Sequence, residues 1–219
     1  MRTSFALAAV ATTALSFQAN ANLVSNGSFE LGDFNNTDGD PRPEVMLVTP
    51  GMPNVFGWTI EGAHGVHWLD YGLANTTDGG RSLDLQGNNP PVLSSVSTTF
   101  ATQSGSGYRL SFDAFTGNVL NSATVSVGSL IGQAFTGGGP APTFPFASHF
   151  SHYTYEFDAT DSLSTLLFQV SSSDGFGPVI DNVVVTAQPG PRATPEPDTY
   201  LLLGSAIALL CASRMRRTS

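Results

Sequence analysis

The sequence contains no lysine and only one cysteine, and each of these absences excludes a class of chemistry. Cys211 lies in an apolar stretch near the C-terminus, so the body of the chain has no disulfide pair, thiolate metal site or thiol nucleophile. Without lysine there is no Schiff-base chemistry, and the chain has no Gly-x-Ser-x-Gly or Ser-x-x-Lys motif. We therefore expect a protein that is not an enzyme.

Positive charge is also scarce. Between Asn22 and Pro191 three arginines (Arg42, Arg81 and Arg109) stand against fifteen Asp and Glu residues, a formal net charge of −12. Such a surface repels phosphate backbones, which excludes nucleic acid as a partner. An acidic domain can instead attract divalent cations.

Residues 1–21 show the three parts of a secretory signal peptide. Arg2 supplies the positive charge, Phe5 to Phe17 is apolar or small, and Ala19-Asn20-Ala21 resembles a signal-peptidase site. We expect cleavage after Ala21 and export of the remaining chain.

The C-terminus also has three parts. A Pro-rich stalk at residues 188–198 contains Pro195-Glu196-Pro197, and an uncharged apolar run follows from Thr199 to Ser213. Three arginines come next: Arg214, Arg216 and Arg217. As a helix the run is about 22 Å long, so it spans a hydrocarbon core of about 30 Å only if the arginines snorkel and the bilayer thins. The positive-inside rule places the arginines in the cytoplasm and the domain outside.

This order resembles the PEP-CTERM sorting signal. In that family the tail is a temporary anchor, which an exosortase-type membrane protease removes near the Pro-Glu-Pro motif. The resemblance implies that residues 199–219 are a transmembrane helix with a basic tail. It also implies that the protein is anchored transiently in the inner membrane and then reaches the cell surface or the medium.

Residues 22–187 form one domain of ordinary size, in which short alternating runs are separated by Gly, Asn, Asp, Ser and Pro. The alternation in Tyr108–Phe115 directs its even-numbered residues to one face. Ten strands are expected: Glu44–Val48, Val55–Glu61, Val66–Asp70, Ser82–Gln86, Val92–Phe100, Tyr108–Phe115, Ala123–Val127, Thr154–Asp158, Leu163–Val170 and Val179–Thr186. Their spacing predicts an all-β antiparallel sandwich or barrel.

Six segments in order resemble a recurrent cell-wall module. They are Asn22–Glu30, Phe56–Ile60, Val66–Leu69, Asp78–Leu85, Ser97–Phe100 and Phe176–Val183. Together they are similar to the choice-of-anchor C and domain-of-unknown-function 642 group, from Asn22 to Thr186. The resemblance implies a galactose-binding-like jelly-roll β-sandwich related to carbohydrate-binding modules, although a fold does not by itself give a function.

Glu30 and Asp181 lie in the first and last strands expected for the domain. In jelly rolls of this kind those strands are neighbours, and a structural Ca²⁺ often lies there, so the resemblance suggests both carboxylates as ligands. Asp78, in an Asp-Gly-Gly loop, is a third candidate, because hard cations prefer oxygen ligands. The alternative is that these carboxylates accept backbone N–H groups in turns.

Aromatic residues suggest a sugar-binding surface. Trp58 alternates with Phe56 and Ile60 and is expected in the core. Trp68 precedes Asp70, Tyr71 and Gly72, which looks like a strand entering a loop. A sugar surface is therefore predicted from four residues: Trp68, Tyr71, Arg81 and His67, with His64 nearby. The ordinary alternative is that Trp68 is a core residue.

Two further histidine pairs are weak candidates for metal binding. His64 and His67, and likewise His149 and His152, are three residues apart, and such residues point to opposite faces of a strand. No zinc site is expected. The sequence thus predicts an exported, non-catalytic envelope or extracellular-matrix protein that binds polysaccharide. A structural or adhesive matrix protein without a sugar ligand is the alternative, and a small glycan hydrolase is less favoured.

Overall fold

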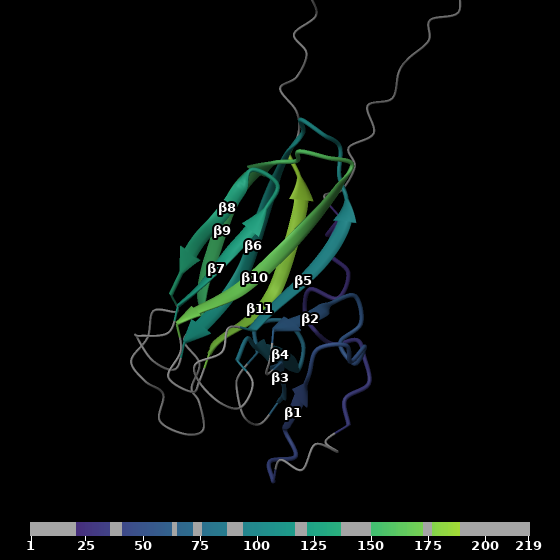
Figure 1. Ribbon diagram of the computed structural model, residues 1–219, viewed down its shortest axis with the longest axis vertical. Coiled ribbons are helices and arrows are strands. Elements are labelled where there is room, and N and C mark those ends of the chain that lie inside the picture. Colours follow the sequence, from purple (N-terminus) through teal and green to yellow (C-terminus); the bar gives the residue numbers. More distant parts are fainter. Residues whose placement is uncertain are drawn as a thin grey trace, which may run out of the picture. The chain divides into compact units, whose positions relative to one another are not determined.

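The computed structural model describes residues 21–35, 41–62, 65–71, 76–86, 94–116, 122–136, 150–172 and 177–188 (Figure 1). All but Gln188 belong to one unit, Met1–Ala187, and a second unit comprises Gln188–Ser219. The predictions for the signal peptide, the Pro-Glu-Pro motif, the apolar run, the arginine cluster, His64 and His149 lie outside the described residues. Within the described ranges no helix is long and apolar enough to cross a membrane.

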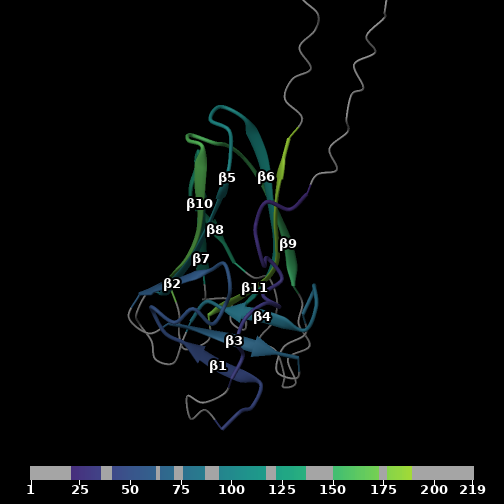
Figure 2. The ribbon, with the colours of Figure 1, turned by 90° about the vertical axis from the view of Figure 1, so that its right-hand side faces the viewer.

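The described residues form two antiparallel sheets. Their strands are β1 (Val45–Val48), β2 (Thr59–Gly62), β3 (Val66–Asp70), β4 (Arg81–Asp84), β5 (Ser94–Ala101), β6 (Gly107–Thr116), β7 (Ser122–Val127), β8 (Leu130–Phe135), β9 (Ser151–Asp158), β10 (Leu163–Ser172) and β11 (Pro178–Ala187). One sheet has the order β1-β3-β4-β11-β6-β9 and the other β2-β5-β10-β7-β8. Figure 2 shows β5, β7, β8 and β10 in one layer, facing β6, β9 and β11 in the other. The prediction of an all-β antiparallel sandwich is confirmed.

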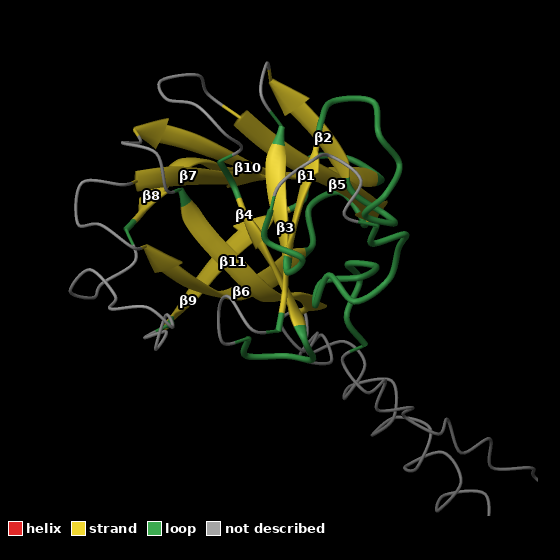
Figure 3. Ribbon diagram, turned by 90° about the horizontal axis from the view of Figure 1, so that it is seen from below, coloured by secondary structure: helices red, strands yellow, loops and turns green. Residues whose placement is uncertain are grey.

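One expected strand is shortened in the structure and one observed strand was not expected, and both differences involve glycine. The expected strand Val55–Glu61 is reduced to β2, because Gly57 has a positive φ of 81° and ends the extended conformation before it. β8 was not expected, since Gly132 interrupts it at φ 59° and most of its side chains are exposed. Figure 3 shows strands joined by loops, with no helix in the part of the chain that is drawn in colour.

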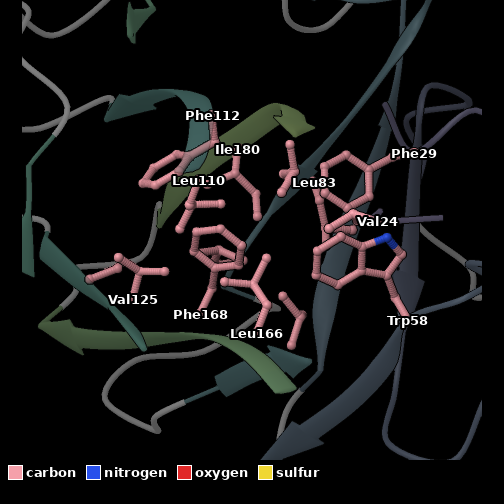
Figure 4. Close-up of a cluster of buried hydrophobic side chains, with 14 of the residues drawn as sticks. Val24, Phe29, Trp58, Leu83, Leu110, Phe112, Val125, Leu166, Phe168 and Ile180 are labelled. Atoms are coloured by element: carbon pink, nitrogen blue, oxygen red, sulfur yellow. The ribbon is translucent and has the colours of Figure 1, made fainter. Parts of the chain in front are cut away.

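The main hydrophobic core fills the space between the two sheets (Figure 4). As the alternation predicted, Tyr108, Leu110, Phe112 and Ala114 of β6 all belong to it. Each large apolar side chain buried here contributes about 1.5–3 kcal/mol relative to an exposed one. The prediction for Trp58 is also confirmed: it is buried, and its ring centroid lies 5.1 Å from that of Phe29. Phe56, however, is exposed.

The first residues of the domain run beside the last strand, as the resemblance implied, but they form turns and not the strand that was expected to carry Glu30. Leu23 N–H donates to the Val185 carbonyl, and Val183 N–H donates to the Gly27 carbonyl, both at 2.9 Å. This contact is possible because β4 pairs with β11 only at Val179 and Ile180, which leaves backbone groups of Val183 and Val185 on that edge for the first residues. The turn that follows carries Glu30 next to the loop before β4.

The middle of the six-stranded sheet is buried on both faces. Trp68, Leu83 and Ile180 are register partners on the inner face and belong to the main core. Their chain neighbours point to the outer face, where a second apolar cluster forms from Val45, Leu69, Phe115 and Val179. The polar residues described below share this outer face, which sequence alternation alone would have placed in solvent.

Candidate functional site

Glu30 holds the loop that leads into β4. Its Oε1 atom accepts backbone N–H groups from Gly80 at 2.7 Å and Arg81 at 2.6 Å. Gly79 has a positive φ of 83°, and a Cβ atom there would lie 2.4 Å from Glu30 Oε1. The loop therefore requires glycine at this position, both for its backbone conformation and for the approach of the carboxylate.

Asp181 holds the same loop from the other side. Its Oδ2 atom accepts Thr77 N–H at 2.6 Å, the Thr77 hydroxyl at 3.2 Å and Asp78 N–H at 3.0 Å. Its Oδ1 atom accepts Asn182 N–H at 2.7 Å. Burial raises the pKa of Asp181 to about 6, although the N–H donors favour the charged form. We call Glu30, Asp181 and the loop 76–81 the loop clamp.

The loop clamp brings together the three residues suggested as calcium ligands, but Asp78 takes part through its backbone N–H and the carboxylates of the other two have another role. Glu30 and Asp181 accept backbone N–H groups, which is the alternative that the sequence left open. Both oxygens of Asp181 face N–H or O–H donors, and this donor set does not suit a cation. Among the described residues no three His, Cys, Asp or Glu side chains are grouped as a metal site would need. Calcium binding remains an untested prediction.

Trp68 does not have the exposed position predicted for it. Its side chain is 0% exposed, and its Nε1–H donates to the Phe29 carbonyl at 3.0 Å. The expectation failed because β3 pairs on both edges, with β1 and with β4, and therefore lies inside the sheet. Trp68 cannot stack on a sugar, and the alternative of a core residue is correct.

Arg81 and Tyr71 do lie at the surface, beside the loop clamp. The Arg81 guanidinium carbon is 4.9 Å from the Trp68 ring centroid and 5.0 Å from that of Phe34, while Nη1 donates to the Glu30 carbonyl at 3.1 Å. Tyr71 is 71% exposed, and its Cβ lies 3.9 Å from the position that a Cβ on Gly80 would take. We call Tyr71, Arg81 and the half-buried Phe34 the edge surface.

His67, the fourth predicted sugar-binding residue, is buried on the outer face of the six-stranded sheet. Its Nδ1 lies 3.7 Å from Asp84 Oδ2, and burial raises the pKa of Asp84 against the opposing effect of His67. Ser82 and Gln86 lie on the same face. In this sheet-face cluster of His67, Ser82, Asp84 and Gln86, four buried atoms have no hydrogen-bond partner among the described residues: His67 Nε2, Ser82 Oγ and both amide atoms of Gln86. His67 therefore does not belong to the edge surface.

Another polar group on this face was not anticipated from the sequence. His152 Nδ1 lies 2.6 Å from Asp113 Oδ1, and Asn182 Nδ2–H donates to Asp113 Oδ2 at 3.0 Å. Burial alone raises the pKa of Asp113, but hydrogen bonds from His152, Asn182 and Thr77 outweigh it and hold the pKa below its ordinary value. Asp113 and His152 become neighbours only through the register of β6 and β9, which no local motif reveals.

Comparison with known proteins gives a family and a fold. The model of the family described as "Protein of unknown function (DUF642)" matches residues 22–186. Among curated proteins, none matches the chain. Among solved structures, the chain is similar to TmCBM61 in complex with beta-1,4-galactotriose, with a TM-score of 0.52 and 13% identity over 77% of this chain and 99% of that one.

Two other solved structures are similar at lower TM-scores. One is the CBM22-1 xylan-binding domain of Paenibacillus barcinonensis Xyn10C, with a TM-score of 0.46 and 15% identity over 78% of this chain and 97% of that one. The other is the enzymatically active domain of tailspike protein 4 of bacteriophage CBA120, with a TM-score of 0.48 and 17% identity. The match covers 76% of this chain but only 21% of the tailspike chain. The similarity to TmCBM61, at 13% identity and a TM-score of 0.52, shows the fold alone.

Proposed function

Because the chain belongs to the DUF642 family and folds as a sandwich similar to a carbohydrate-binding module, we propose that its domain binds polysaccharide without transforming it. The observation that carries this proposal is the edge surface. There Tyr71 is exposed, one residue beyond Asp70, which is the register partner of Arg81, and the Arg81 guanidinium lies over the Trp68 ring.

The chemistry of the edge surface suits a sugar. The C–H face of a pyranose ring packs against an aromatic ring, and the N–H groups of Arg81 can donate to hydroxyl oxygens. The Trp68 ring beneath the guanidinium and the Glu30 carbonyl, which accepts Nη1, orient the arginine side chain. A prearranged donor loses less conformational entropy when a ligand binds. Two of the four predicted residues, Tyr71 and Arg81, therefore remain in the proposal as direct contacts.

Retention on polysaccharide tests this proposal. We expect Tyr71→Ala to abolish retention of the protein on immobilised cell-wall polysaccharides while its melting temperature stays unchanged, because the side chain is exposed. Ile131→Ala, which removes an exposed side chain from β8 in the other sheet, is the matched control and should leave retention intact. If Tyr71→Ala is retained as strongly as the wild-type protein, the assignment of the edge surface as the polysaccharide-binding site is overturned. A wild-type protein retained on no polysaccharide would favour the structural or adhesive alternative.

We further propose that the protein is exported and sorted as its two termini suggest. The support is the sequence alone: a signal-peptide pattern at residues 1–21, and a PEP-CTERM-like tail with Pro195-Glu196-Pro197 before an apolar run and Arg214, Arg216 and Arg217. The choice-of-anchor C resemblance belongs to the same proposal. Mass spectrometry of protein from the native host should find a chain that begins at Asn22 and ends near Pro195. A C-terminus that still contains Arg217 would argue for a permanent membrane anchor.

A further inference from the structure

Arg81 carries a positive charge that the domain does not neutralise. Arg109, by contrast, forms an exposed ion pair with Glu156, with Nη2 at 3.2 Å from Oε1. Within the described part of the chain, no carboxylate lies within ion-pairing distance of the Arg81 guanidinium. Glu30 is adjacent, but its carboxylate binds the backbone N–H of Arg81 and leaves the side chain unpaired.

The lack of a partner is informative because the domain is strongly acidic. Between Asn22 and Pro191 there are fifteen Asp and Glu residues and only three arginines. In such a surface an arginine readily finds a carboxylate, as Arg109 does. The Arg81 guanidinium is instead held over the aromatic rings of Phe34 and Trp68, at 5.0 and 4.9 Å. A cation over an aromatic face keeps its charge.

Most of the hydrogen-bonding capacity of Arg81 is unused. A guanidinium has five N–H donors, and the structure accounts for one bond, from Nη1 to the Glu30 carbonyl. A planar fork with free donors binds a carboxylate through two parallel hydrogen bonds, which are stronger than bonds to a neutral hydroxyl. The fixed orientation of the plane favours such a bidentate ligand over single hydroxyl groups.

We propose that the edge surface binds an acidic polysaccharide, with the carboxylate of a uronic acid residue paired to Arg81 and a sugar ring packed on Tyr71. This inference rests on the proposed function and specifies its ligand class. Because the rest of the domain is acidic, the attraction is local. At physiological ionic strength charges are screened beyond about 8 Å, so one carboxylate near Arg81 is attracted while a dense polyanion is repelled by the surrounding acids.

The first experiment uses the wild-type protein and a matched pair of probes. One probe is a short xylan fragment that bears a single glucuronic acid, and the other is the same fragment with its carboxylate reduced to an alcohol. We expect calorimetry to show binding about 10- to 100-fold weaker for the reduced probe, as the loss of a charge-assisted bidentate contact requires. Equal affinity for both probes would overturn the uronate assignment and leave the proposed function standing. Failure to bind these probes or any neutral polysaccharide would overturn both.

The second experiment assigns the contact to Arg81. Arg81→Gln should lower the affinity for the acidic probe to that for the reduced probe, and should leave the affinity for the reduced probe nearly unchanged. Arg81→Lys keeps the charge but loses the planar fork, so its affinity for the acidic probe should lie between that of the wild-type protein and that of Arg81→Gln. Arg109→Gln removes the same charge from a paired site and should have no effect. If Arg81→Gln and Arg109→Gln lose the same affinity for the acidic probe, the assignment is overturned, because the loss then reflects only the change in net charge. The probe pair decides the case with wild-type protein even if Arg81→Gln does not fold.

Discussion

Consecutive residues of β3 and β4 are buried on two different faces of the same sheet. On the inner face Trp68 and Leu83 belong to the main core, and the one polar atom of the Trp68 side chain is bonded to the Phe29 carbonyl. On the outer face His67 and Asp84 are also buried but polar, and they lie beside atoms that have no hydrogen-bond partner in the described part of the chain. Equal burial thus has different consequences. An inner residue contributes through packing, and an outer residue contributes according to how well its polar atoms are bonded.

Truncation on the inner face should have the largest effect. Trp68→Ala removes a fully buried ring and its bond to Phe29, so the free energy of unfolding should fall by about 3–5 kcal/mol. Tyr71→Ala, just beyond the same strand, should change it by no more than about 0.5 kcal/mol because Tyr71 is exposed. Urea unfolding measures both. If Trp68→Ala lowers the free energy of unfolding by less than about 1 kcal/mol, the inner face tolerates a cavity. The contrast between the inner and outer faces would then disappear.

The outer face should make stability depend on pH. In the folded protein the pKa of Asp181 is raised from 3.8 to about 6, so the native state binds this proton more tightly than the unfolded state does. Its contribution to stability is therefore complete below about pH 4 and is lost as the pH rises through 6, by roughly 3 kcal/mol. Asp84, whose pKa is also raised, adds to this loss. Asp113, whose pKa is lowered, acts at lower pH, where stability is lost as the pH falls below 3.8.

Urea unfolding at pH 4, 5, 6 and 7 measures this dependence. Asp181→Asn keeps an acceptor oxygen but cannot ionise, so it should flatten the decrease between pH 4 and 6. If the variant and the wild-type protein lose stability in parallel, the proton is not bound at Asp181, and the outer face does not titrate as described.

The sequence predicted the structure best where one alternating pattern of apolar residues determines which face of a strand is buried. Alternation in Tyr108–Phe115 predicted which side of β6 faces the core, because one buried face and one outer face repeat every two residues. The same reasoning fails for Ser82, Asp84 and Gln86. Polar residues at a spacing of two normally indicate a solvent-exposed face, whereas here that face is buried. Burial on a second face depends on contacts distant in the chain, which no local pattern encodes.

For the candidate site, the sequence identified residue types better than it identified their roles. Glu30 and Asp181 were singled out together, and they do hold one loop. Whether a carboxylate in such a place binds a cation or backbone N–H groups depends on the conformation of the loop between them. That conformation is set in part by the positive φ of Gly79. Trp68 was expected to be exposed near the end of a strand because Asp70, Tyr71 and Gly72 follow it. Only the pairing of β3 with both β1 and β4 shows that it is central.

A smaller difference in the free energy of unfolding should distinguish buried polar groups that are hydrogen-bonded from those that are not. Ser82 and Ser164 are both buried serines in strands. Ser164 Oγ lies 3.0 Å from Thr102 Oγ1, whereas Ser82 Oγ has no partner among the residues that the structure describes. Ser164→Ala should therefore cost about 1 kcal/mol in the free energy of unfolding, and Ser82→Ala should be neutral or stabilising. The two variants make the same change in volume, so the difference between their urea midpoints isolates the hydrogen bond. Equal costs would indicate that an ordered water bonds Ser82.

Metal removal should have the smallest effect on stability, because the carboxylates of Glu30 and Asp181 already accept N–H groups from within the chain. Asp181 accepts N–H groups from Thr77, Asp78 and Asn182, so none of these contacts requires a cation. We expect EDTA to change the melting temperature by less than about 1 °C, well under the shift that a loss of 1 kcal/mol produces in a domain of this size.

The calcium site predicted from the sequence gives a different pattern. A bound ion stabilises the native state by mass action, so EDTA would lower the melting temperature and added Ca²⁺ would restore it. Glu30→Gln separates the two cases, because it keeps an acceptor for Gly80 and Arg81 but weakens any calcium site. If added Ca²⁺ raises the melting temperature of the wild-type protein but not that of Glu30→Gln, the metal site is established. The loop clamp would then need a cation to hold its loop.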